Sequence, residues 1–235
     1  MGYQLQGSVL RDMMCYSEAY LAHRKAFLIA QGLFNPELIA SSLVREGITL
    51  NQQERPVEAI TCFMRALEII KHLGYVKLEG YIYQAFTEAQ AKTQQSKESW
   101  YSIGNAEMAF EQQTVIPEQT LTRFNISSLT AQKGVYAMFL QEYKNAVDQL
   151  DKSLANYDPT LFRGRARLLV QKAEAYYELG ILDACTDNIQ NAFSLARSIG
   201  SSKIMSRAKT LYRNLKQSKW RKERVVADLS DVLEE

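Results

Sequence analysis

The amino-acid sequence predicts an all-α protein, a solenoid of about five helical hairpins with a C-terminal capping helix. Apolar residues recur every three or four positions through nearly the whole chain, and no stretch alternates long enough with period two to form a strand. A pattern of small, bulky and small residues also repeats at equal spacings, with Gly47, Ala59, Phe63 and Ala66 matching Ala173, Cys185, Ile189 and Ala192. Such a repeat indicates stacked helix pairs that each pack only on their neighbours.

Proline and glycine predict where the helices begin and end. Each proline stands directly before an apolar-periodic run, where its missing N–H costs nothing; these are Pro36, Pro56, Pro117 and Pro159. Asn35 and Asp158 precede two of them and are N-cap residue types. Gly32, Gly74 and Gly200 follow the last periodic residue and suit a left-handed C-cap, with His72 in the last turn before Gly74. The expected helices span 3–14, 17–31, 36–52, 56–73, 77–95, 97–113, 117–141, 143–156, 159–179, 182–199, 202–217 and 221–233.

The repeated positions resemble the tetratricopeptide repeat (TPR). Position eight of a TPR unit is small, and positions twenty, twenty-four and twenty-seven are small, bulky and small, so that paired helices approach closely. Besides the two copies above, the pattern occurs in Gly7, Ala19, His23 and Ala26; in Thr87, Ser99, Ile103 and Ala106; and in Gly134, Ala146, Leu150 and Ser153. The third of the five copies fits worst. The resemblance implies a right-handed α-solenoid.

A narrower resemblance concerns the end of the chain. The phrase from Ala196 to Ser201, followed by a basic helix and then by Trp220, is similar to the C-terminal sensor regions of bacterial helix-turn-helix transcriptional regulators. It implies a signalling or regulatory module, either excised or free-standing. The expected organisation is a repeat array over 1–201 and a basic capping helix with a short terminal helix over 202–235.

Composition excludes several classes of function. The chain of 235 residues has 28 Lys and Arg against 26 Asp and Glu, so its net charge of +2 gives no field that would recruit nucleic acid or an acidic membrane. Cys15, Cys62 and Cys185 lie far apart and predict small buried residues of a reducing compartment. No secretory or membrane-spanning segment is recognisable. These features predict a cytoplasmic location.

The sequence contains no recognisable catalytic or cofactor motif. Its two histidines, His23 and His72, are a poor supply for acid–base or metal chemistry, and His23 occupies a packing position of the repeat. Phosphate-binding loops, metalloprotease motifs and nucleophile elbows are absent from the sequence. We therefore expect no enzyme activity, no metal and no cofactor.

The TPR resemblance implies a concave groove lined by the first helices, which would bind a protein or peptide. The residues expected there are Arg11, Ser41, Asn51, Tyr81, Gln84, Glu88, Arg167, Glu174 and Tyr177. Two alternatives stay open: a homodimerisation or assembly module, and a nucleic-acid-binding accessory acting through the basic segment 203–224. For that segment, a capping function is favoured, because solenoids need a polar end cap.

Overall fold

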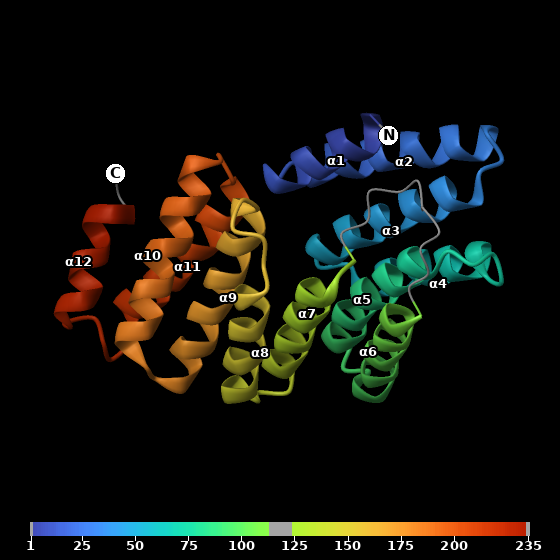
Figure 1. Cartoon of the computed structure of the whole chain (residues 1–235). Helices are drawn as coiled ribbons and strands as arrows, with labels where there is room; N and C mark the ends of the chain where they lie inside the picture. The colour runs from blue at the N-terminus through green and yellow to red at the C-terminus, as the bar shows by residue number, and fades with distance from the viewer. Residues whose placement is uncertain (1, 113–123, 234–235) are drawn as a thin grey trace. The chain divides into compact units, whose positions relative to one another are not determined.

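The computed structural model describes residues 2–112 and 124–233, which form twelve α-helices and no strand (Figure 1). The all-α prediction is thereby confirmed. The helices are α1 (Gly2–Asp12), α2 (Tyr16–Gly32), α3 (Pro36–Gln52), α4 (Pro56–Ile70), α5 (Val76–Lys92), α6 (Ser96–Glu111), α7 (Ile126–Phe139), α8 (Tyr143–Ala155), α9 (Phe162–Leu179), α10 (Leu182–Ser198), α11 (Ser202–Gln217) and α12 (Arg224–Leu233).

The helices belong to two compact units, residues 1–132 and 133–235. Unit 1 contains the hairpins α1/α2, α3/α4 and α5/α6 and the beginning of α7. Unit 2 contains the rest of α7, then α8, the hairpin α9/α10, and α11 and α12. Within the units each hairpin packs on the next, α2 on α3, α4 on α5 and α8 on α9. The expected boundary between an array over 1–201 and a cap over 202–235 stays a prediction.

The residues that define the repeat are buried in all five copies. The third copy, which fits the pattern worst in the sequence, obeys the same rule, since Thr87 and Ser99 are both fully buried. Ser99 Oγ donates a hydrogen bond to the carbonyl oxygen of Thr87 at 2.9 Å, which joins α5 to α6. A polar pair thus replaces the small apolar pair of the other copies without leaving an unpaired hydroxyl.

Close contact between position eight and position twenty-four explains why position eight is small. A Cβ added to Gly47 would lie 2.6 Å from a ring carbon of Phe63, and one added to Gly134 would lie 2.9 Å from Leu150 Cγ. In the first copy the same Cβ on Gly7 would lie 2.5 Å from the imidazole of His23. Because these distances are shorter than a carbon–carbon contact, a larger residue would push the two helices of the hairpin apart.

Two of the predicted N-caps differ in outcome. Asn35 caps α3 as expected, because its Oδ1 accepts a hydrogen bond from the backbone N–H of Leu38 at 3.0 Å. The prediction for Asp158 is wrong: its carboxylate accepts from the N–H and hydroxyl of Thr160, and α9 begins only at Phe162. The Asp158 carboxylate is therefore hydrogen-bonded within a local turn and does not cap a helix.

The expected helix over 117–141 is also too long. Phe124 and Asn125 are not helical, and α7 begins at Ile126. Asn125 acts as a cap there, since its Oδ1 accepts from the N–H of Ser128 at 2.8 Å. Pro117 lies outside the described residues.

The helix ends use glycine less often than expected. Gly74 and Gly200 have the predicted left-handed conformation, with φ of 79° and 65°. Gly32, however, is the last residue of α2, and Phe34 takes the left-handed conformation with φ of 50°. His72 follows the end of α4 at Ile70 and is likewise left-handed, with φ of 63°, so its expected place in the last helical turn is wrong.

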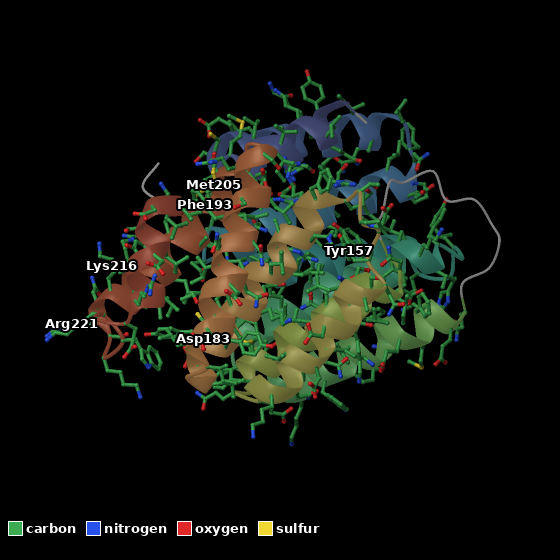
Figure 2. The ribbon with its side chains drawn as sticks, turned by 60° about the vertical axis from the view of Figure 1, so that its left-hand side comes forward. Tyr157, Asp183, Phe193, Met205, Lys216 and Arg221 are labelled. Atoms are coloured by element: carbon green, nitrogen blue, oxygen red, sulfur yellow. The ribbon has the colours of Figure 1, made fainter. Side chains whose placement is uncertain are left out.

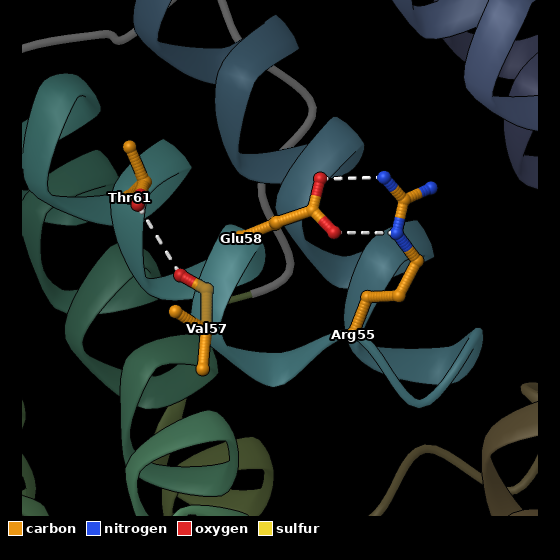
Figure 3. A network of polar contacts seen from close by, with 4 residues as sticks. All are labelled: Arg55, Val57, Glu58 and Thr61. Atoms are coloured by element: carbon orange, nitrogen blue, oxygen red, sulfur yellow. Dashed lines mark hydrogen bonds and ion pairs between the residues drawn. The ribbon is translucent and has the colours of Figure 1, made fainter.

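The first turn of α4 carries an exposed ion pair (Figure 3). Arg55 Nε donates to Glu58 Oε1 at 2.6 Å, and Arg55 Nη2 donates to Glu58 Oε2 at 2.5 Å. This hydrogen bonding lowers the pKa of Glu58 below its ordinary value. One turn further on, the hydroxyl of Thr61 donates to the carbonyl oxygen of Val57 at 3.2 Å. Because the pair is solvated and screened, it contributes little to stability.

Candidate functional site

The first helices of unit 1 carry a set of polar residues that we name the first-helix face. It consists of Gln4, Ser8 and Arg11 on α1, Ser41, Arg45 and Asn51 on α3, and Tyr81, Gln84 and Glu88 on α5. Within this set Gln4, Ser41, Asn51 and Gln84 are buried and the others are half-buried. Two side-chain hydrogen bonds join α1 to α3 near this face. Gln4 Nε2 donates to Ser42 Oγ at 2.9 Å, and Arg45 Nη1 donates to Ser8 Oγ at 3.3 Å. These bonds link polar groups from successive repeats.

Two guanidinium groups dominate the charge of this face. Burial lowers the pKa of Arg11, and the positive charge of Arg45 lowers it further. Tyr81 and Asp12 act in the opposite direction, so Arg11 interacts electrostatically with groups on α1, α3 and α5. Arg11 Nη1 is buried and has no hydrogen-bond partner among the described residues. Such a donor costs free energy unless an acceptor reaches it.

Asn51 and Ser41 are both buried on α3. The Oδ1 atom of Asn51 has no hydrogen-bond partner within the described part of the chain. Its backbone carbonyl oxygen accepts from Lys92 Nζ at 3.0 Å, and the same ammonium group pairs with Glu54 at 2.8 Å. Lys92 was not among the predicted residues, yet it connects α5 to the end of α3.

Gln84 has a structural role in addition to its place on the face. Its Nε2 donates to the carbonyl oxygen of Ser128 at 3.0 Å, and its Oε1 accepts from the hydroxyl of Ser128 at 3.3 Å. These bonds hold the first turn of α7 against α5. Glu88, one turn after Gln84, and Tyr81 before it are half-buried on α5.

In unit 2, segments after α10 contact two of the three predicted residues. Arg207 on α11 donates to both carboxylate oxygens of Glu174, at 3.1 and 2.6 Å. The ring of Tyr177 packs edge-on against Trp220, with centroids 5.7 Å apart. Arg167 is half-buried on the same helix, α9. Glu174 and Tyr177 therefore have partners within the chain, unlike the buried guanidinium atom of Arg11 in unit 1.

The basic segment 203–224 folds onto unit 2. Three of its ammonium groups lie over aromatic rings, with Lys209 Nζ 5.4 Å from the centroid of Phe193, Lys216 Nζ 5.2 Å from Tyr212, and Lys219 Nζ 4.9 Å from Trp220. Arg221, by contrast, points away from the helices (Figure 2). Apolar residues of α11 and α12 pack in the same cluster as those of α10. The apolar packing is what a cap on the last hairpin requires, while Lys209, Lys216 and Lys219 stay exposed, and the choice between capping and nucleic-acid binding stays a prediction.

A cavity of about 60 Å³ lies between α1, α2 and α3, lined by Tyr3, Gln4, Ala26, Ile29, Ala30, Leu33 and Leu38. A pocket for a small organic ligand needs about 300 Å³ or more. The residues that the structure describes contain no group of three His, Cys, Asp or Glu side chains able to hold a metal ion. Within the same ranges, no helix is long and apolar enough to cross a membrane.

The three cysteines are unpaired thiols. Cys62 and Cys185 are buried as expected, and burial raises the pKa of each to about 12. Cys15 is only half-buried, because it forms the N-cap of α2 instead of a core position. A thiol with so high a pKa is a packing group and not a nucleophile.

No protein-family model and no curated protein matches the sequence. Solved structures do match the fold. BtubC (BKLC) from P. vanneervenii is 14% identical with a TM-score of 0.56, and the match covers 84% of this chain and 80% of that one. A putative kinesin light chain from Podosopora anserina with TPR-like repeats is 12% identical with a TM-score of 0.51, covering 86% and 96%. The APC/C hetero-tetramer Cut9–Hcn1 matches with 14% identity and a TM-score of 0.58, covering 99% of this chain but 42% of that chain.

These similarities establish the fold. The chain is a TPR-like α-solenoid, as the repeat pattern predicts. At such low identity, nothing about the ligands of the matched proteins follows for this chain.

Proposed function

We propose that the protein is a non-enzymatic protein- or peptide-binding module, and that its first-helix face in unit 1 binds an extended segment carrying carboxylate groups. The observation that carries the proposal is the guanidinium group of Arg11: the residue is half-buried, its Nη1 donor has no hydrogen-bond partner among the described residues, and its charge interacts with that of Arg45. A carboxylate is the acceptor that best satisfies a guanidinium group, because it can accept two parallel hydrogen bonds.

Binding alone would produce the functional effect. A segment that contacts α1, α3 and α5 together favours one arrangement of the three hairpins. An attached or separate effector protein then responds to that arrangement. The signalling or transcriptional role implied by the sequence resemblance, and a cytoplasmic location, belong to this proposal. The half-buried Tyr81, which interacts electrostatically with Arg11, supplies a ring that can contact a peptide side chain.

Peptides selected from a random display library on the wild-type protein should be enriched in Asp and Glu. Arg11→Gln and Arg45→Gln should each weaken the best selected peptide about tenfold or more, because each removes a charge-assisted hydrogen bond from a partly buried site. Isothermal titration calorimetry measures both affinities.

Arg213→Gln provides the matched control, since Arg213 is an exposed arginine on α11 in unit 2. This variant should bind the peptide as the wild type does. Selection of peptides without acidic enrichment, or equal binding by Arg11→Gln and wild type, would contradict the proposed site.

A further inference from the structure

The outer side of α2 carries an apolar stripe with a spacing of seven residues. Leu21 and Leu28 form this stripe and have exposed fractions of 58% and 55%, and Met14, 42% exposed, precedes the helix with a left-handed φ of 65°. Met14 directly precedes the N-cap of α2, and the two leucines lie two turns apart on the helix. The opposite side of α2 is buried in unit 1 through Ala19, His23, Ala26 and Ala30. Two exposed leucines on one side of a helix provide an apolar surface on which another helix can pack.

Equivalent positions on the other second helices show that this stripe is not a requirement of the fold. The positions of Leu21 and Leu28 are occupied by Thr61 and Glu68 in α4, by Asp148 and Ala155 in α8, and by Asp187 and Ser194 in α10. Only α6 is also apolar there, with Tyr101 and Met108. Exposed leucines lower the solubility of a protein and add no packing energy unless another surface covers them. The stripe on α2 is therefore suited to an interaction beyond the chain itself.

Charges beside the stripe are arranged to match a second copy of the same helix. Glu18 and Lys25 are exposed and seven residues apart, on the same side as Leu21. In an antiparallel pair of α2 helices related by a two-fold axis next to Leu21, the two Leu21 side chains meet, and Leu28 of each copy lies near the start of the other α2. Glu18 then lies opposite Lys25 of the second copy, and the symmetry repeats the contact. Within its own chain Lys25 lies 5.7 Å from the centroid of the Tyr3 ring, and the nearby Arg24 pairs with Glu46 at 3.8 Å.

We propose that two copies of this chain associate through antiparallel packing of their α2 stripes. A two-fold interface is closed, so it yields dimers and not filaments. The surface is separate from the first-helix face, so dimerisation and peptide binding are independent properties of the molecule. A heterologous partner helix or a monomeric protein is the alternative outcome.

Sedimentation over a concentration series tests the proposal. The wild-type protein should approach twice the monomer mass of 26.8 kDa. Leu21→Glu should raise the dimer dissociation constant by at least about 30-fold, because it brings two carboxylates together at the centre of an apolar contact. Glu18→Lys should weaken the dimer about tenfold, and adding Lys25→Glu should restore it, since the paired charges are then exchanged.

Leu5→Glu is the matched control, since Leu5 on α1 is an equally exposed leucine, at 69%, outside the stripe. Its dimer should be unchanged, and circular dichroism should show both leucine variants folded. A wild-type protein that stays monomeric at every concentration would overturn the proposal. A dimer that is lost in Leu5→Glu but kept in Leu21→Glu would do the same. Arg11→Gln should dimerise normally, so failure of the peptide site is distinguishable from failure of the dimer.

Discussion

Replacing Ala192 by glutamate is expected to destabilise unit 2 by at least about 3 kcal/mol. Ala192 is fully buried on α10, within the cluster that contains Phe193, Ile204 and Ala208. A glutamate there must either bury a carboxylate without a partner or force α10 and α11 apart. Urea unfolding followed by circular dichroism measures the loss as a lower midpoint.

Ser194→Glu is the control for that substitution. Ser194 is exposed two residues further along the same helix, so a carboxylate there stays in water. Its unfolding midpoint should differ little from that of the wild type. If Ser194→Glu proved as damaging as Ala192→Glu, the side of α10 assigned to the core would be wrong.

The buried imidazole of His23 is expected to make the protein acid-sensitive. Burial, together with the positive charges of Arg11 and Arg45, lowers the pKa of His23 from 6.5 to about 3. Between these two values the unfolded chain binds a proton that the folded protein does not, so the free energy of unfolding decreases as the pH falls. The decrease is at most about 1.4 kcal/mol per pH unit from this group. Above pH 6.5 this contribution is fully retained.

His23→Leu should remove this pH dependence and also stabilise the protein at neutral pH by about 1–3 kcal/mol. Neither imidazole nitrogen has a hydrogen-bond partner among the described residues, and their removal relieves that cost. The fourth copy shows that leucine fits, because Leu150 packs on Gly134 as His23 packs on Gly7.

Unfolding curves at several pH values test both effects, with the difference between variant and wild type as the readout. Burial raises the pKa of Glu46 on α3, a shift that acts on stability in the opposite direction, but this contribution cancels in the difference. His72→Asn is the control: its free energy of unfolding should depend on pH as that of the wild type does, because His72 is exposed outside the helices. Equal acid sensitivity of wild type and His23→Leu would show that the imidazole is not buried against the two arginines.

The sequence predicts the repeat register well because that register reflects close packing. Position eight has to be small wherever position twenty-four fills the space between paired helices, and Gly47 with Phe63 shows this contact directly. Even the polar third copy obeys it through Ser99 and Thr87. A pattern that arises from steric exclusion is visible in the residues themselves.

Helix ends are harder to predict than the repeat register, because residue types that signal a helix start or stop also form local turns. Asp158 is an N-cap type, yet Thr160 satisfies its carboxylate first. Phe34 and His72 adopt the left-handed conformation expected of glycine, although both residues are exposed. Residue type alone predicts neither the turn at Asp158 nor the left-handed backbone of Phe34 and His72.

The candidate site was predicted in outline only. Family positions placed Arg11 and Tyr81 on first helices, but they did not include Arg45, which stands at unit position six and donates to Ser8. They also could not show that Arg207 and Trp220 contact Glu174 and Tyr177, because both partners lie beyond the repeat. Contacts between distant segments depend on tertiary structure, which no single repeat encodes.

Hydrogen-exchange mass spectrometry with a selected acidic peptide tests the central claim most directly. If the first-helix face is the binding site, the peptide should slow exchange in α1, α3 and α5 together, because its contacts span three repeats. Protection confined to the second helices α2, α4 and α6, or to α11, would show that the protein binds its partner elsewhere.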